Sequence, residues 1–283
     1  MKTRLLFIIL IVFTASATSF SFGSDHGRAA VVQLSGTIQP SSSRGLYSSG
    51  GITPEKVREI NDKIRRENYE AVIYEINSGG GAVVASKEVK REIESLDIPK
   101  VCRFRDIAAS GAYLFSLGCD RIVADSATIT GSIGVKSSYL EFSEAMNRYG
   151  VDYVNISSGR YKELGSQFQN ISDEEREILQ EKSDMIHEQF LEMVKSERNI
   201  TDSEHRPIRT GVIYLGSEAK KIGLVDRLGG RGTAKKVAEN MTGKELSLNQ
   251  VSMEQSFSFS SLLASFKPGN LLRFSGLPLV ASY

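Results

Sequence analysis

The sequence predicts an α/β fold built on a largely parallel β-sheet. Strand-like and helix-like segments alternate from residue 29 to residue 124, which is typical of parallel sheets with helical crossovers. Two turns rich in glycine or serine follow strand-like segments, as at the ligand-binding edge of such sheets. Of the 283 residues, 40% are hydrophobic, which is enough for the core of one large domain or two small ones.

Short apolar and β-branched runs predict strands at residues 29–34, 71–76, 100–104 and 121–124. Helices are predicted between them. The first begins at Thr53, an N-cap residue followed by proline, and the second covers about residues 83–96. The third follows Ser110, with apolar residues at helical spacing and Gly118 at its end. Right-handed crossovers would bring the glycine turn at 77–81 and the turn at Ser110 to the same strand ends.

The second half of the chain alternates less regularly. Helices are predicted at about 139–149, 172–197, 216–223 and 230–241, and strands at 151–156 and 224–225. Ser172 and Glu175 form a capping-box pattern at the start of the longest helix. We expect residues 29–245 to form the folded domain. Residues 246–283, rich in serine, phenylalanine and leucine, are expected to form a loosely attached apolar tail that contacts membrane or another subunit.

The N-terminus has the pattern of an export signal. Lys2 and Arg4 precede the uninterrupted apolar run 5–13, and small residues follow it, as in a secretory signal with a cleavage site. No charged residue occurs from Leu5 to Phe22, a length just sufficient to span a bilayer. Positive charges before this run would keep the N-terminus in the cytoplasm. We therefore expect residues 1–23 to be a signal peptide or a membrane anchor, and the rest of the chain to be extracytoplasmic.

Composition argues against several classes of function. Lys and Arg number 35 against 34 Asp and Glu, so no strong field would gather nucleic acid. The glycine turn matches neither the phosphate-loop nor the dinucleotide pattern. The three histidines are scattered, so neither a metal site nor a histidine base is expected unless a distant histidine folds back. Cys102 and Cys119 are too few for a disulfide framework and are interpreted as small buried apolar side chains.

Ser110 and Lys162 are the candidates for chemistry. Ser110 lies where a turn becomes a helix, so it could present a nucleophilic oxygen, although a serine that caps the helix is the simpler interpretation. Glycines 79–81 could point N–H groups at an oxyanion or form an ordinary tight turn. A lysine can serve as the base of a serine nucleophile when burial lowers its pKa from ~10.4 towards neutrality. Lys162 stands in a turn bounded by glycine and serine, and an ordinary surface charge is the alternative.

Four motifs together resemble the signal peptide peptidase A family of serine proteases. They are Asn77-Ser-Gly-Gly-Gly81, Ala109-Ser-Gly-Ala-Tyr113, Thr130-Gly-Ser-Ile-Gly-Val135 and Ser158-Gly-Arg-Tyr-Lys162, in the family's order. The similarity covers about residues 31–230. It implies the fold of the Clp protease and crotonase superfamily, built of repeated β-β-α and βαβ units, with a protease domain at residues 29–245. Gly79 departs from the pattern, because the family usually has proline there, and this leaves the loop freer to move.

The resemblance also implies a role for each motif residue. Ser110 would be the nucleophile and Lys162 the general base. Ser132 would hydrogen-bond the lysine and orient it. The backbone N–H groups of Gly80 and Gly111 would form the oxyanion hole. The expected site is therefore a Ser/Lys dyad that needs no metal ion or cofactor.

The sequence thus predicts a membrane-associated serine endopeptidase. By the resemblance, its substrates would be cleaved signal peptides and other short hydrophobic peptides, and the protein would form a homo-oligomer. One alternative is a crotonase-like acyl-CoA enzyme that uses the same oxyanion hole without a covalent serine; an export signal argues against it, since the coenzyme is intracellular. The other alternative is an inactive membrane scaffold.

Overall fold

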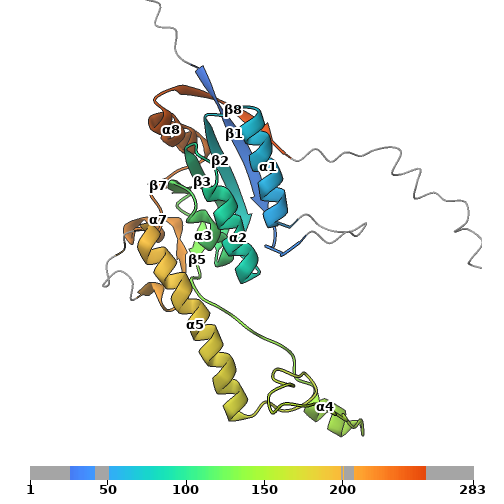
Figure 1. Cartoon of the computed structure of the whole chain (residues 1–283). Helices are drawn as coiled ribbons and strands as arrows, with labels where there is room; N and C mark the ends of the chain where they lie inside the picture. Colours follow the sequence, from blue (N-terminus) through green and yellow to red (C-terminus); the bar gives the residue numbers. More distant parts are fainter. Residues whose placement is uncertain (1–25, 42–50, 199, 201–206, 253–283) are drawn as a thin grey trace, which may run out of the picture.

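The computed structural model describes residues 26–41, 51–198, 200 and 207–252. Eight strands form one sheet in the order β6-β5-β3-β2-β1-β8, with β4 beside β3 and β7 beside β4 (Figure 1). The strands are β1 (His26–Ser35), β2 (Ala71–Ser78), β3 (Lys100–Ala109), β4 (Arg121–Ala124), β5 (Ile129–Gly131), β6 (Ile213–Leu215), β7 (Arg227–Leu228) and β8 (Glu245–Val251). The pairs are parallel except β5 with β6. The predicted α/β class with a largely parallel sheet is confirmed.

Helices cover both faces of the sheet. They are α1 (Pro54–Arg66), α2 (Val83–Glu94), α3 (Gly111–Ser116), α4 (Ser143–Arg148), α5 (Asp173–Arg198), α7 (Gly216–Lys221) and α8 (Arg231–Thr242). Alternate residues of β2 face opposite ways: Val72 and Tyr74 join the larger hydrophobic cluster under α1, α2 and α3, whereas Ala71 and Ile73 pack in the smaller cluster with α8. Because both faces are covered, the central strands are buried along most of their length, as is usual in parallel sheets.

Helix α1 forms as its sequence predicts. Thr53 is the N-cap, and its hydroxyl oxygen accepts the backbone N–H of Lys56 at 3.3 Å. Val57, Ile60 and Ile64 form the predicted apolar stripe and are buried. Burial of each such side chain stabilises the fold by about 1.5–3 kcal/mol, so this stripe fixes α1 on the sheet.

Two predicted strands are wrong. Residues 151–156 are exposed coil, because the described part of the chain places no strand beside them to share backbone hydrogen bonds. Leu224 and Val225 are buried, but they lie in the turn after α7, and strand β7 begins only at Arg227. In both cases the composition is apolar and β-branched, but a strand forms only where another strand lies beside the segment to share backbone hydrogen bonds.

Besides β7, three strands have no counterpart in the sequence-based prediction. β5 and β6 have three residues each, too few to show a period. β8 pairs in parallel with β1, so the sheet continues beyond residue 245, where the folded domain is expected to end. The predicted signal or anchor at residues 1–23, and the tail from residue 253 onward, lie outside the described residues.

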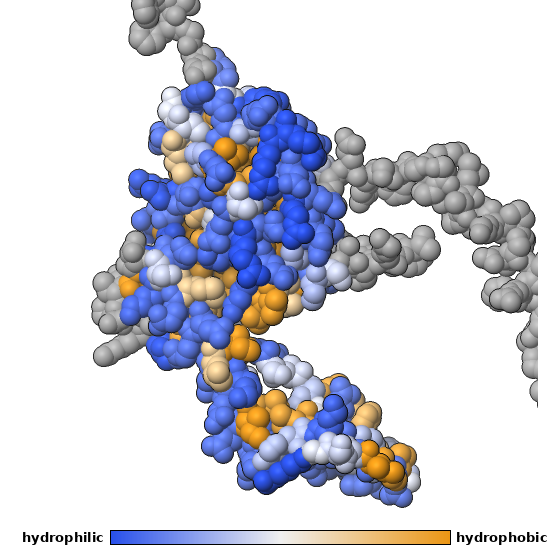
Figure 2. Space-filling view, viewed as in Figure 1, coloured by the Kyte–Doolittle hydropathy of each residue, from blue (hydrophilic) through white to orange (hydrophobic). Residues whose placement is uncertain are grey.

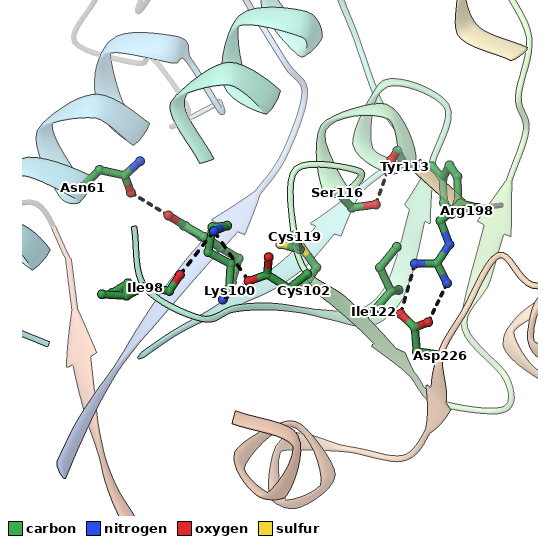
Figure 3. Close-up of a disulfide and its surroundings, with 12 residues drawn as sticks. Asn61, Ile98, Lys100, Cys102, Tyr113, Ser116, Cys119, Ile122, Arg198 and Asp226 are labelled. Carbon is green, nitrogen blue, oxygen red and sulfur yellow. Dashed lines mark hydrogen bonds and ion pairs between the residues drawn. A yellow bond between two sulfur atoms is a disulfide. The ribbon is translucent and has the colours of Figure 1, made fainter. Parts of the chain in front are cut away.

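Cys102 and Cys119 form a disulfide that joins β3 to the turn after α3 (Figure 3). Their Cα atoms are 5.7 Å apart and their sequence separation is 17 residues. Both side chains are buried as predicted, but their interpretation as separate apolar side chains is corrected. The turn returns to β3 because the N–H of Asp120 donates to the carbonyl of Lys100 at 2.9 Å. The loop that the disulfide closes contains Ser110.

Helix α5 carries an extension away from the sheet. Its first turn has the predicted capping box, in which the N–H of Glu175 donates to the Ser172 hydroxyl at 3.2 Å and the N–H of Ser172 donates to the Glu175 carboxylate at 2.9 Å. Only the C-terminal half of α5 has buried side chains. Residues 139–171, which include α4, form an arm at the end of α5 farthest from α3 (Figure 1). Within the described ranges, no helix has the length and apolar character needed to cross a membrane.

Candidate active site

Ser110 lies at the junction of β3 and α3 in an unusual backbone conformation. Its φ is 54° and its ψ is −124°, a region that residues other than glycine seldom occupy. Its N–H donates to the carbonyl of Gly131 at 2.8 Å. Its hydroxyl makes no capping hydrogen bond to α3. The interpretation of Ser110 as an N-cap serine therefore loses its support, and the hydroxyl is available for other chemistry.

Gly80 touches the serine turn directly. A Cβ atom at position 80 would lie 2.8 Å from the backbone nitrogen of Gly111 and 3.0 Å from the Cβ of Ser110. The φ of Gly80 is +105°, so both space and backbone conformation require glycine there. At position 111, a Cβ would lie 2.4 Å from the hydroxyl oxygen of Ser86. The two turns predicted to meet at the same strand ends are in contact.

The backbone N–H groups of Gly80 and Gly111, which are expected to form an oxyanion hole, differ in their hydrogen-bond acceptors. Gly111 is the first residue of α3, where backbone N–H groups have no acceptor within the helix. The N–H of Gly80 donates to the hydroxyl of Ser78 at 3.1 Å, and Ser78 is buried. A change of the Ser78 χ1 rotamer would move this oxygen away and free the Gly80 N–H for a substrate oxygen without a change in the backbone.

Ser132 follows the end of the neighbouring strand. Ala109 of β3 pairs with Gly131 of β5, so Ser110 and Ser132 each come directly after a paired residue of two adjacent parallel strands. Ser132 also has a positive φ, 49°, and its N–H donates to the carbonyl of Val212 at 3.0 Å. The sheet register thus places Ser132 next to the serine turn.

Lys162 is not brought to this site within one chain. It lies in the arm, in the turn that precedes α5, and its side chain is exposed. The neighbouring Arg160 and Tyr161 both contact the carboxylate of Glu174 on the first turn of α5, which holds this turn to the end of α5 farthest from α3 (Figure 1). Of the residues expected to act together, the single chain assembles Ser110, Gly80, Gly111 and Ser132.

A small pocket with a cavity volume of about 20 Å³ lies beside Ser110. It is lined by Gly81, Val83, Lys87, Ser110, Gly111, Leu114, Gly134, Val135, Ile186 and Phe190. Two of its walls come from α5, where Ile186 and Phe190 are one helical turn apart. That spacing predicts an apolar face on α5, but the sequence does not say what the face covers. The site therefore includes residues of α2 and α5 that motif comparison does not identify.

One histidine does fold back towards this region. The ring Nε2 of His187 lies 3.0 Å from the carbonyl oxygen of Ile133, which is the donor geometry of a neutral or protonated imidazole. This bond ties α5 to the segment that carries Ser132 and the pocket residue Gly134. His187 thus connects two walls of the pocket.

A buried polar network holds α3 in place. The Tyr113 hydroxyl donates to the carbonyl of Leu224 at 3.0 Å, and burial raises the pKa of this phenol, so it stays a neutral donor. Arg198 at the end of α5 forms a two-pronged ion pair with Asp226, with contacts of 2.8 and 3.1 Å (Figure 3). The carboxylate of Asp226 also accepts the N–H of Ile122 at 2.7 Å. Together these bonds connect α3, β4 and α5 to the turn after α7, which contains Leu224 and Asp226.

Comparisons with known proteins identify the family to which the chain belongs. Residues 92–246 match Peptidase family S49. The chain is 33% identical over 205 residues to "Putative protease MJ0651" of Methanocaldococcus jannaschii. That alignment covers 69% of this chain and 66% of the relative. It is 32% identical over 211 residues to "Putative signal peptide peptidase SppA" of Enterococcus faecium, covering 73% of this chain and 61% of that protein. The chain thus spans somewhat less than two thirds of the length of these relatives.

A solved structure has the same fold. It is the 1510-N membrane-bound stomatin-specific protease in complex with a substrate peptide, with a TM-score of 0.53 and 14% sequence identity. The alignment covers 85% of this chain and 99% of that chain. The resemblance drawn from the four motifs is confirmed, and the chain belongs to Peptidase family S49.

Proposed function

We propose that this protein is a serine endopeptidase whose nucleophile is Ser110. The observation that carries the proposal is the strained serine turn. The Ser110 hydroxyl makes no capping hydrogen bond to α3, and the turn lies against Gly80. The Ser110 oxygen attacks a peptide carbonyl carbon, and the neutral amine of Lys162 takes its proton. The N–H groups of Gly111 and Gly80 stabilise the resulting oxyanion. The lysine returns the proton to the leaving amine, and water then hydrolyses the acyl-enzyme.

Lys162 has to reach Ser110 from outside the body of its own chain. We propose that it comes from the arm of a second copy in a homo-oligomer. The arm exposes apolar side chains that a monomer would leave in water: Leu140 is 71% exposed, Tyr149 81%, Val154 80% and Ile156 96%. Figure 2 shows apolar patches on the arm and where it joins the body. Exposed apolar surface of this kind is characteristic of protein interfaces.

The small apolar pocket beside Ser110 favours short peptides with a small apolar residue next to the cleaved bond. Val83, Leu114 and Phe190 supply its apolar walls. Cleaved signal peptides are apolar and are released at the membrane, where the N-terminal segment would hold this protein. The extracytoplasmic location and the signal-peptide substrates are supported by the export pattern of residues 1–23 and by the names of the relatives.

Hydrolysis of a fluorogenic apolar peptide tests the nucleophile and the base. The full chain is compared with Ser110→Ala, Lys162→Ala and the control Lys236→Ala, whose exposed lysine lies on α8 across the sheet. We expect both site variants to lose at least about 10³-fold in kcat, and the control to keep wild-type activity. Circular dichroism checks that every variant is folded. Full activity in Ser110→Ala would refute the proposal, and acyl-CoA turnover in that variant would favour the crotonase-like alternative.

Co-expression of two inactive variants tests where the lysine comes from. When Ser110→Ala and Lys162→Ala chains assemble at random, a site built from two copies regains about a quarter of wild-type activity. A site built within one chain regains none. An oligomer that forms normally but has no activity in wild type would indicate the inactive scaffold.

A further inference from the structure

The pocket beside Ser110 contains one charged side chain. Lys87 lies in the second turn of α2, the helix that follows the glycine motif. It lines the same pocket as Ser110, Leu114 and Phe190. Its side chain is partly exposed and the hydrogen bond that its ammonium group makes lies at the surface, so the ammonium group is at the mouth of the pocket. A cation in this position has no part in the chemistry proposed for Ser110 and Lys162.

Within the described part of the chain, no acidic side chain neutralises the charge of Lys87. Its Nζ donates to the amide oxygen of Gln189 on α5 at 2.7 Å, which satisfies one of three donors with an uncharged partner. Among the residues that the structure describes, Lys87 has no carboxylate within ion-pair distance. The nearby Lys90, in contrast, contacts the carboxylates of both Glu94 and Glu197.

The acidic residue closest in sequence to Gln189 is already paired. Glu188 forms an ion pair with Arg209, so it does not neutralise Lys87. The Lys87–Gln189 contact therefore joins α2 to α5 across the pocket mouth and leaves two ammonium donors for a ligand. A carboxylate would be the matching group, because hydrogen bonds between an ammonium and a carboxylate are roughly twice as strong as neutral ones.

We infer that Lys87 is a specificity-determining residue that binds a carboxylate of the peptide substrate. This inference rests on the proposed peptidase function of the same site. The preferred substrate would place a small apolar side chain at the pocket and a carboxylate at its mouth. The carboxylate could be the C-terminus of a short peptide or the side chain of an acidic residue, and both present the same chemistry to Lys87.

Binding of labelled peptides tests the inference apart from catalysis. Three peptides share one apolar sequence: the first has a free C-terminal carboxylate, the second a C-terminal amide, and the third a C-terminal amide with one Glu scanned along it. Fluorescence anisotropy measures their Kd for the full chain carrying Ser110→Ala, alone or with Lys87→Gln, Lys87→Glu or the control Lys236→Gln. The kcat/KM values of the same peptides are measured in the Ser110 background.

We expect Lys87→Gln to weaken binding of carboxylate-bearing peptides about tenfold, which corresponds to one charge-assisted hydrogen bond. Binding of the uncharged amide peptide should change less than about twofold. Lys87→Glu should weaken carboxylate binding further, through like-charge repulsion, and added salt should reduce the wild-type preference. Lys236→Gln should leave every value unchanged. The peptide that responds identifies the source of the carboxylate.

Other outcomes would overturn the inference in distinct ways. If wild type cleaves the peptides and Lys87→Gln keeps the same carboxylate preference, Lys87 does not read the carboxylate. If folded Lys87→Gln weakens all three peptides equally, Lys87 acts on the pocket as a whole and confers no such specificity. If wild type neither binds nor cleaves any peptide, the proposed peptidase function fails, and the inference fails with it.

Discussion

Gly80 and Ser110 lie so close that a side chain at position 80 would collide with the serine turn. Its Cβ would be 3.0 Å from the Cβ of Ser110 and 2.8 Å from the nitrogen of Gly111. Gly79 next to it is different, because a Cβ there meets only the side chain of Ile107, at 3.7 Å. Position 79 thus has room for a side chain and position 80 does not. Substitutions at the two positions can therefore distinguish the effect of contact with the serine turn from the effect of loop flexibility.

Gly80→Ala and Gly79→Ala form a matched pair. Gly80→Ala is expected to abolish peptidase activity and lower the free energy of unfolding by about 1–3 kcal/mol, because alanine is strained at positive φ. Gly79→Ala should keep activity and stabilise the fold by about 0.4–1 kcal/mol, since it removes freedom from the unfolded chain. Urea denaturation and peptide hydrolysis measure both variants. Equal effects of the two changes would contradict the contact described for Gly80.

The backbone conformation of Ser110 predicts a gain in stability when function is removed. Ser110→Gly relieves a positive φ of 54°, whereas Ser110→Ala retains it. We expect both variants to be inactive and Ser110→Gly to be more stable than Ser110→Ala by about 1 kcal/mol. Chemical denaturation of the two proteins provides the comparison. Identical midpoints would mean that the serine turn stores no strain.

The disulfide between Cys102 and Cys119 should stabilise the loop that carries Ser110. For a sequence separation of 17 residues, loop closure accounts for about 3 kcal/mol. Reduction with dithiothreitol should lower the free energy of unfolding by about that amount. The double variant Cys102→Ala/Cys119→Ala serves as the control, because its stability should not respond to the reductant. A wild type that is equally stable with and without reductant would rule out this contribution.

Glu75 predicts a loss of stability in acid. Its carboxylate is fully buried and pairs with Arg231 and Arg103. The hydrogen bond from Arg231 holds the pKa of Glu75 below its usual range. The stabilisation is therefore complete above the unfolded-state pKa of about 4.3 and disappears as the pH falls through the lower folded-state pKa.

Glu75→Gln measures this contribution. At pH 7 it should lower the free energy of unfolding by about 1.5–3 kcal/mol, and the difference from wild type should shrink as the pH falls below about 4. Glu70→Gln is the control, since the pair of Glu70 with Lys244 is at the surface and such pairs contribute about 0–1 kcal/mol. A difference that does not depend on pH would show that Glu75 acts through packing alone.

The local sequence by itself determined the regular core and the motif residues. The stripe of Val57, Ile60 and Ile64, the Thr53 cap and the capping box at Ser172 depend on contacts within a few residues, and all three form as predicted. Family motifs also identified the chain as a member of Peptidase family S49. These features are readable because their partners lie close in the sequence or in a fixed motif order.

Only the tertiary structure decided which distant segments meet. Residues 151–156 have strand-like composition, but they lie in the arm without a neighbouring strand, whereas the short β5 forms because β3 and β6 lie on either side of it. The disulfide depends on a chain return that the cysteine count does not reveal.

The site divides in the same way. The sequence named Ser110, Gly80 and Ser132, and parallel register brings their turns together. It could not place Lys162, since the position of the arm depends on how α5 leaves the body, nor could it add Lys87 and Phe190, which join the pocket only because α2 and α5 pack beside α3. Periodicity reports which face of an element is apolar; packing between elements far apart in the chain decides what that face covers.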